Sequence, residues 1–213
     1  MSKTVHIIAN NVGKKFGKEW IFRHVDLSIQ QGDKLAILGL NGSGKSTLLQ
    51  ALTGYLAINE GSIDYQVNNQ TIEADKPYQY ISLASPYLEL VEDFTLKEQL
   101  IHAEKFKAFL PSLTIQSIIE LSGLKAHQHK YIKQFSSGMR QRLKLVLAIL
   151  ADAPVLFLDE PTTNLDAKVI EWYKEMIQQY AFHKTIIVCS NSIKDEYHFC
   201  DKVIHIESYK VKT

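Results

Sequence analysis

The sequence predicts an α/β fold, with a mostly parallel sheet covered by helices on both faces. Strand-like and helix-like patterns alternate along most of the chain, which is typical of parallel sheets. The runs 35–38 and 155–158 are apolar throughout, as expected for strands buried on both faces. The chain has 213 residues, of which 46% are hydrophobic and 22% are charged, and this is ordinary for one globular domain.

The N-terminal part is expected to be rich in antiparallel β-structure. Val25, Leu27 and Ile29 alternate with polar residues, which is the pattern of a strand with one buried face. Other short β-type runs predict strands at 5–8, 63–67 and 80–83. A helix is expected to begin at Lys45 and to end at about Leu56.

Between about residues 94 and 150 the apolar residues recur with a helical period. Thr95 and Glu98 have the spacing of a capping box at the start of a helix, and Gly123 is expected to end a second one. A third helix, from Ser136 through Leu150, is apolar nearly all round, which predicts burial. We expect one domain, 1–213, with a helical subdomain inserted at about 94–150, followed by a helix at 168–180 and strands at 185–189 and 203–206.

Composition excludes several classes of protein. Lys and Arg number 24 and Asp and Glu 23, so the net charge of +1 argues against binding to nucleic acid. Two cysteines are too few for a disulfide framework, which suits a reducing cytosol. No apolar run approaches the roughly 18–20 residues of a membrane span, and residues 1–6 lack the apolar stretch that a secretory signal needs. We therefore expect a soluble intracellular protein that reaches a membrane only through a partner.

The segment 39–46, GLNGSGKS, matches the phosphate-loop pattern G-x-x-x-x-G-K-[ST] between a buried strand and a helix. Glycines let backbone N–H groups approach phosphate oxygens, and the helix start adds further N–H donors. A dinucleotide-binding loop is a poorer match, because the third glycine of G-x-G-x-x-G is missing. Lys45 is expected on the β- and γ-phosphates, Ser46 on Mg²⁺, and Thr47 on the phosphates nearer the sugar. The predicted ATP-binding residues of this loop are Gly39, Asn41, Gly42, Ser43, Gly44, Lys45, Ser46 and Thr47.

Two carboxylates follow the apolar strand 155–158. A parallel strand would place Asp159 and Glu160 at the carboxyl edge of the sheet, where open α/β folds bind ligands. Asp159 is the expected partner of Mg²⁺. Glu160 is expected to point the other way along the pleat and to deprotonate an attacking water.

Ser136 and Gly138 open the third helix of the helical segment and could bind an anion with a hydroxyl and backbone N–H groups. Together with the phosphate loop and the acidic strand end, in this order, they make the chain resemble the ATP-binding cassette (ABC) family of transporter ATPases. The resemblance covers nearly the whole chain. It implies that Ser136 and Gly138 of one subunit close over the γ-phosphate bound by another, with two ATP molecules buried in a dimer. It also implies that Asp166 shapes the dimer contact and that Phe16 stacks on adenine, with Trp20 as a rival aromatic.

The sequence departs from the family at two positions. The family has a His near the γ-phosphate where this chain has Asn191, and Asn cannot carry a proton or a positive charge near neutral pH. The family has a Gln in the loop entering the helical subdomain, but 81–87 contains none, and Ser85 or Pro86 is nearest in register. We therefore expect sound ATP binding, with hydrolysis that is slow or that relies on Glu160 with Asn191 as a weaker orienting group.

The resemblance implies an ATP-binding and ATP-hydrolysing subunit that requires Mg²⁺. It would dimerise with itself or with another ATP-binding subunit, and would lie on the inner face of the membrane through a separate transmembrane permease subunit. A second hypothesis is a hydrolysis-impaired module that binds ATP as the regulatory half of a heterodimer. A third, a cassette acting on DNA or ribosomes, is disfavoured by the neutral charge and the single cassette.

Overall fold

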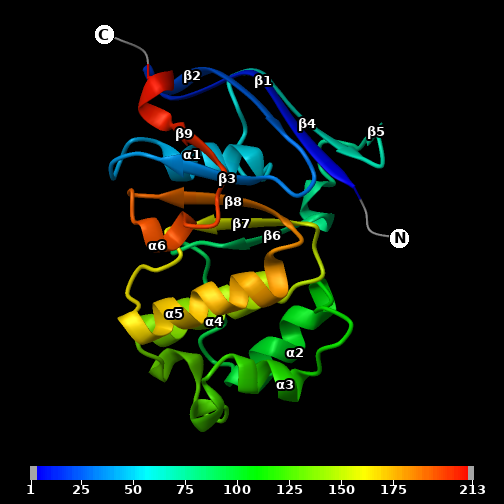
Figure 1. Cartoon of the computed structure of the whole chain (residues 1–213), viewed down its shortest axis with the longest axis vertical. Helices are drawn as coiled ribbons and strands as arrows, with labels where there is room; N and C mark the ends of the chain where they lie inside the picture. Colours follow the sequence, from blue (N-terminus) through cyan, green and yellow to red (C-terminus); the bar gives the residue numbers. More distant parts are fainter. Residues whose placement is uncertain (1–3, 211–213) are drawn as a thin grey trace.

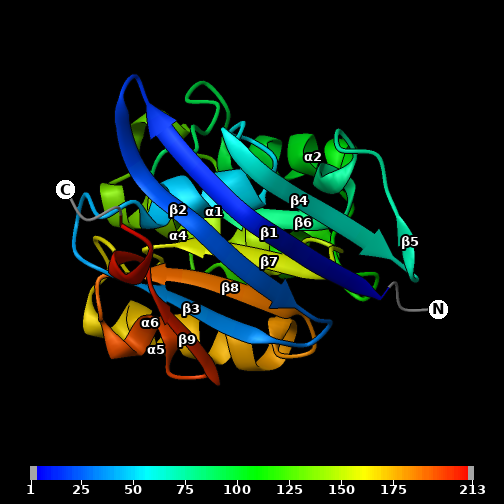
Figure 2. The same ribbon diagram turned by 90° about the horizontal axis from the view of Figure 1, so that it is seen from above.

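The computed structural model describes residues 4–210 and stacks two sheets with helices between and below them (Figure 1). One sheet is antiparallel, with strand order β2-β1-β4-β5, and crosses over the other when seen from above (Figure 2). Its strands are β1 (Val5–Phe16), β2 (Glu19–Ile29), β4 (Glu60–Val67) and β5 (Gln70–Thr71). The predicted β-rich N-terminal part therefore forms a sheet of its own.

The second sheet is parallel throughout, with strand order β6-β7-β8-β3-β9. Its strands are β3 (Lys34–Leu38), β6 (Ile81–Ala84), β7 (Val155–Asp159), β8 (Thr185–Ser190) and β9 (Lys202–His205). Every residue of β3, β7 and β8 is buried, because layers cover both faces of the sheet. Because these central strands are parallel, the loops that follow them leave the sheet at the same edge.

Helices cover both faces of the parallel sheet, as expected (Figure 1). The helix α1 (Lys45–Leu52) lies between the two sheets, whereas α4 (Ser137–Ile149) and α5 (Ala167–Met176) lie on the opposite face. Beyond them lie α2 (Leu96–Phe106) and α3 (Ile115–Leu121), and α6 (Lys194–Tyr197) follows β8. The 3₁₀ segments are Pro77–Gln79, Lys125–His127, Ile132–Gln134 and Ile206–Tyr209, and Ile177–Ala181 is a π-helix. No helix formed by residues 4–210 has the length and apolar character needed to cross a bilayer.

The buried apolar side chains form two clusters, one on each face of the parallel sheet. The cluster between the sheets includes Phe22, Leu48 and Phe157. The cluster on the helical side includes Leu100, Ile118, Leu143, Leu156 and Tyr173. The second cluster joins the helical segment to the parallel sheet, because α4 packs directly against β6 and β7.

Several element boundaries differ from the expected ones. The helix after the phosphate loop ends at Leu52, because Gly54 with φ of 76° turns the chain. The helix expected at 168–180 changes to a π-helix at Ile177. The helix that begins after Ser136 is buried mainly in its second half, because Ser137 is exposed and Met139 and Arg140 stay partly exposed. The capping box of Thr95 and Glu98 is confirmed.

Candidate functional site

The phosphate loop connects the buried strand β3 to α1 at the carboxyl edge of the parallel sheet. Helix α1 begins after Gly44, with no side-chain cap and no acidic residue in its first turn. The first N–H groups of any helix have no partner within it, and here no capping side chain satisfies them. No acidic residue offsets the positive end of the helix dipole either. This combination favours an anion at the start of α1.

Two glycines of the loop stand where no side chain fits. Gly44 has φ of 108°, and a Cβ atom there would lie 2.6 Å from Ile21 Cγ2. At Gly39 a Cβ atom would lie 2.7 Å from both Ser43 Oγ and Glu207 Oε1. Glycine at these positions lets the loop fold tightly between β2 and the C-terminal 3₁₀ segment.

The side chain of Lys45 is buried beneath the loop and is 3% exposed. Its Nζ donates a hydrogen bond to the carbonyl oxygen of Leu40 at 3.0 Å and lies 3.7 Å from Glu160 Oε1. A cavity of about 380 Å³ opens at this place. It is lined by Ile21, Asn41, Gly42, Gly44, Lys45, Ser46, Thr47, Tyr87 and Glu160. Most of the predicted ATP-binding residues thus share one cavity with the predicted catalytic acid.

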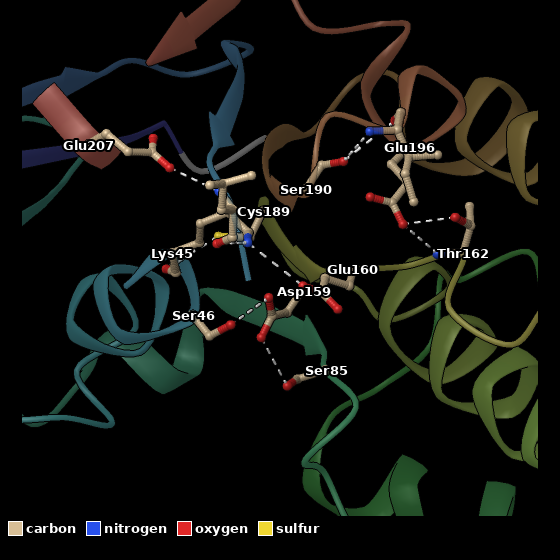
Figure 3. A network of polar contacts seen from close by, with 12 residues as sticks. Lys45, Ser46, Ser85, Asp159, Glu160, Thr162, Cys189, Ser190, Glu196 and Glu207 are labelled. Carbon is tan, nitrogen blue, oxygen red and sulfur yellow. Dashed lines mark hydrogen bonds and ion pairs between the residues drawn. The ribbon is translucent and has the colours of Figure 1, made fainter. Parts of the chain in front are cut away.

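Asp159 lies at the end of β7 between two hydroxyl groups from different elements (Figure 3). Ser46 Oγ donates to Asp159 Oδ1 at 3.0 Å, and Ser85 Oγ donates to Asp159 Oδ2 at 3.4 Å. Burial raises the pKa of Asp159 to about 6, and the hydrogen bond from Ser46 opposes that rise. The neighbouring Glu160 raises the pKa further. This buried carboxylate is therefore suited to a cation, which would stabilise its charged form.

The oxygen atoms around Asp159 fit the ligand chemistry of Mg²⁺. Mg²⁺ binds through one or two protein oxygens and completes its shell with waters and substrate phosphates. Ser46 and Asp159 supply such oxygens beside the phosphate loop. Residues 4–210 contain no group of three or more His, Cys, Asp or Glu side chains placed to hold a metal, so waters and phosphate oxygens would complete the shell.

Glu160 is not positioned by the alternation of the strand, and this expectation was wrong. Strand β7 ends at Asp159, and Glu160 takes a left-handed conformation with φ of 45°. Its N–H donates to the carbonyl oxygen of Cys189 at 2.9 Å, which holds the turn. A left-handed turn after β7, and not the alternation of the strand, therefore places Glu160 at the cavity beside Lys45.

The other predicted site residues lie outside this cavity. Ser136 caps α4, with Oγ accepting the N–H of Met139 at 3.2 Å, and Asp166 caps α5 by accepting the N–H of Val169 at 2.9 Å. A Cβ atom at Gly138 would lie 2.9 Å from the carbonyl oxygen of Asn164. Asn191 is exposed directly after β8. This arrangement leaves the predicted action of Ser136, Gly138 and Asp166 on another subunit's nucleotide as a prediction.

The two candidate aromatic residues for adenine differ in their surroundings. The ring of Trp20 has Arg23 Cζ at 4.4 Å and Lys15 Nζ at 5.1 Å from its centroid. Phe16 is 52% exposed, and Lys14 Nζ lies 4.9 Å from its centroid. Phe16 therefore presents more free ring surface than Trp20, although neither lines the cavity of the phosphate loop.

Several residues of the site carried no signal in the sequence. Ile21 and Tyr87 line the cavity. Glu207, which lies near the C-terminal end of the sequence, accepts a hydrogen bond from the Leu40 N–H at 2.9 Å (Figure 3). Ser85 was only the nearest residue to a missing Gln, yet its hydroxyl reaches Asp159. Each of these contacts joins segments distant in the chain, so no local spacing could reveal it.

Comparisons with known proteins agree with this geometry. The family model described as ABC transporter matches residues 22–163. The uncharacterized ABC transporter ATP-binding protein YdbJ of Bacillus subtilis is 28% identical over 93% of this chain, which spans 65% of that relative's length. The lantibiotic transport ATP-binding protein SrtF of Streptococcus pyogenes is 28% identical, over 94% of this chain and 86% of the relative. The chain spans less than two thirds of the length of several other curated relatives, for example 59% of a sulfate/thiosulfate import ATP-binding protein of Synechocystis.

Solved structures share the fold. The dimeric structure of a bacterial ABC transporter cassette superposes with a TM-score of 0.79 at 22% identity, over 97% of each chain. A structure described as the ATP-binding subunit of an ABC transporter gives 0.82 at 23% identity, over 97% of this chain and 88% of the other. The family model spans the helical segment and also most of the residues that line the cavity, in the phosphate loop, at Tyr87 and at Glu160. The chain therefore belongs to the ABC transporter family.

Proposed function

We propose that the chain binds MgATP at the phosphate loop and hydrolyses it, as the ATPase subunit of a transporter. The observation that carries this proposal is the 3.0 Å hydrogen bond from Ser46 Oγ to Asp159 Oδ1. These two residues lie far apart in the sequence, and both types of side chain are suited to Mg²⁺ beside a triphosphate. The relatives support the ATP-binding part of this proposal, since YdbJ and SrtF are both named ATP-binding proteins.

The residues have separate roles in the proposed reaction. Lys45 moves from the Leu40 carbonyl to the β- and γ-phosphates, where its positive charge offsets the charge of the transition state. The N–H groups at the start of α1 hold the phosphates in place. Glu160, at the mouth of the same cavity, orients the attacking water and accepts its proton. Mg²⁺, held by Ser46 and Asp159, would supply additional charge neutralisation on the phosphate oxygens.

Hydrolysis is expected to be slow in the isolated chain. Asn191 replaces a residue that could carry positive charge near the γ-phosphate, and it is exposed in the single chain. The residue nearest in register to the family's Gln is Ser85 or Pro86, and Ser85 contacts Asp159 through a side chain shorter than that of Gln. Both substitutions concern the γ-phosphate and leave the phosphate loop itself complete.

A dimer and a transmembrane permease subunit complete the proposal. Ser136 and Gly138, at the start of α4, would close over the ATP of a second ATP-binding subunit, either a copy of this chain or a relative. A cavity of about 490 Å³ lies between the loop after β6 and the helical segment, lined in part by Pro86, Glu92, Arg140 and Lys144. This cavity is the proposed contact for the permease subunit, which would hold the chain at the inner face of the membrane.

The test compares the wild type with Glu160→Gln, and uses Glu171→Gln on the exposed side of α5 as the charge-matched control. Calorimetry should show Mg²⁺-dependent ATP binding in all three proteins. Phosphate release should fall at least about a hundredfold in Glu160→Gln alone, since the group that accepts the proton is lost. ATP binding with equal phosphate release in the wild type and Glu160→Gln would favour the passive regulatory module. Absence of Mg²⁺-dependent binding would contradict both.

A further inference from the structure

The loop 160–166, between β7 and α5, joins two predicted functional residues, Glu160 at its start and Asp166 at its end. Glu160 and Asn164 both take left-handed conformations, with φ of 45° and 64°. Side chains with a Cβ atom disfavour this conformation, so it persists only where the surroundings hold the chain. The structure shows such contacts on two sides of the loop.

On one side the loop is held by Glu196 of α6. Glu196 is fully buried, and its Oε1 accepts hydrogen bonds from the Thr162 N–H at 3.1 Å and from Thr162 Oγ1 at 2.8 Å (Figure 3). The carbonyl oxygen of Glu196 in turn accepts the Tyr173 hydroxyl at 2.9 Å, which ties α6 to α5. Hydrogen bonds to a carboxylate are stronger than those between neutral groups, so this contact fixes Thr162 firmly.

On the other side the loop is held by α4. Gln141 is 5% exposed, and its Nε2 donates to the carbonyl oxygen of Pro161 at 3.0 Å. One turn earlier, Gly138 approaches Asn164 so closely that a Cβ atom would lie 2.9 Å from the Asn164 carbonyl oxygen. The loop therefore also contacts the helix that begins with the predicted signature residues.

We propose that Glu196 and Gln141 are positioning residues for ATP hydrolysis, which clamp the loop 160–166 so that Glu160 stays at the phosphate cavity. This inference rests on the proposed function and adds residues that lie outside the lining of the phosphate cavity. The clamp connects α4, the catalytic acid and the segment after β8 through consecutive residues, Pro161 and Thr162. Its loss should displace Glu160 and leave the phosphate loop intact.

The variants are Gln141→Met, which keeps the size and lacks the donor, and Thr162→Val, which keeps the shape and lacks the hydroxyl. Glu196→Gln is the conservative variant, because it retains an acceptor oxygen for Thr162. Asp195→Asn is the matched control: it removes the neighbouring charge on α6, which contacts Lys174 of α5 at 2.7 Å and lies outside the clamp. Each protein is assayed for ATP affinity by calorimetry, for kcat at saturating MgATP, and for amide hydrogen exchange in 160–166.

In Gln141→Met and Thr162→Val we expect kcat to fall at least about tenfold, with the Kd for MgATP within about threefold of the wild type. Amide exchange in 160–166 should rise in both, while Glu196→Gln should keep most of the turnover and Asp195→Asn should match the wild type. The inference is overturned if kcat and loop exchange do not change, or if Kd and kcat worsen in parallel, as general destabilisation would cause.

The proposed function and this inference fail in different ways. If the wild type does not hydrolyse ATP, or if Glu160→Gln hydrolyses it equally fast, the proposed function fails, and the catalytic role of the clamp fails with it. If the wild type hydrolyses ATP and the clamp variants do so equally fast, only this inference fails. Amide hydrogen exchange in 160–166 reports on the clamp itself in either case, because this measurement requires no hydrolysis.

Discussion

At Gly44, in the phosphate loop, backbone conformation and packing together exclude a side chain. Its φ is 108°, and a Cβ atom would meet Ile21 Cγ2 at 2.6 Å. We expect Gly44→Ala to weaken MgATP binding at least about tenfold, or about 1.4 kcal/mol, because relief of the contact moves the start of α1. Calorimetry provides the measurement.

Gly32→Ala is a matched control for the conformational strain alone. Gly32 has φ of 87°, and nothing lies within 4 Å of the position that a Cβ atom would occupy. This variant should lose about 1 kcal/mol of unfolding free energy and retain its ATP affinity. Equal loss of ATP affinity in the two variants would contradict the role of crowding at Gly44.

Substituting Phe16 or Trp20 singly tests which aromatic ring stacks on adenine. A base stacked on an aromatic ring is worth about 1–3 kcal/mol, so Phe16→Ala should weaken ATP binding by a factor of about 5 to 150. Binding of tripolyphosphate, which has no base, should not change. If Trp20→Ala rather than Phe16→Ala shows this selective loss, adenine stacks on Trp20, whose ring is already beside Arg23 and Lys15.

At the scale of elements, a buried lysine holds the C-terminal end of α4. Lys184 is fully buried, and its Nζ donates to the carbonyl oxygens of Ile149 at 2.8 Å and Ala151 at 2.6 Å. These carbonyls lack partners within the helix, so a cation suits this end of α4. Burial nevertheless lowers the pKa of Lys184 from 10.5 to about 8, with Asp152 opposing the change.

This lowered pKa makes stability depend on pH. Between about pH 8 and 10.5 the unfolded chain binds a proton at Lys184 that the folded chain has released, so stability rises with pH in this window. Relative to Lys184→Met, the unfolding free energy of the wild type should increase by about 3.4 kcal/mol across this pH window. Urea unfolding at several pH values measures the difference. Parallel pH profiles for the two proteins would show that Lys184 does not titrate in this range.

At the scale of the whole molecule, the prediction concerns dimer closure over ATP. Glu160→Gln with MgATP should sediment as a dimer, because ATP persists in the closed state, and should sediment as a monomer with ADP. Adding Ser136→Asp should weaken the dimer at least about tenfold through repulsion of the γ-phosphate, while Asp still caps α4. The matched control is Thr95→Asp, the same kind of change at the cap of α2. Equal weakening by both changes would contradict a contact between Ser136 and phosphate.

The sequence predicted the order and type of most elements, because their signals are local. Apolar runs predicted β3 and β7, and a capping box predicted the start of α2. Ends of elements were less accurate. The end of α1 depends on Gly54, and the long strand β1 continues to Phe16 through bulges that its partners β2 and β4 accommodate. Such ends depend on neighbouring strands that no window of sequence contains.

By itself the sequence determined the phosphate loop, the acids after β7 and the family, because each depends on residue types at fixed spacing along the chain. Only the tertiary structure decided how these parts meet. It placed Ser46 on Asp159, turned Glu160 out of the pleat toward Lys45, and held the loop 160–166 between Gln141 and Glu196. The physical reason is that hydrogen bonds and close packing act between neighbours in space, and here those neighbours are brought together by the parallel order of β6, β7, β8 and β3.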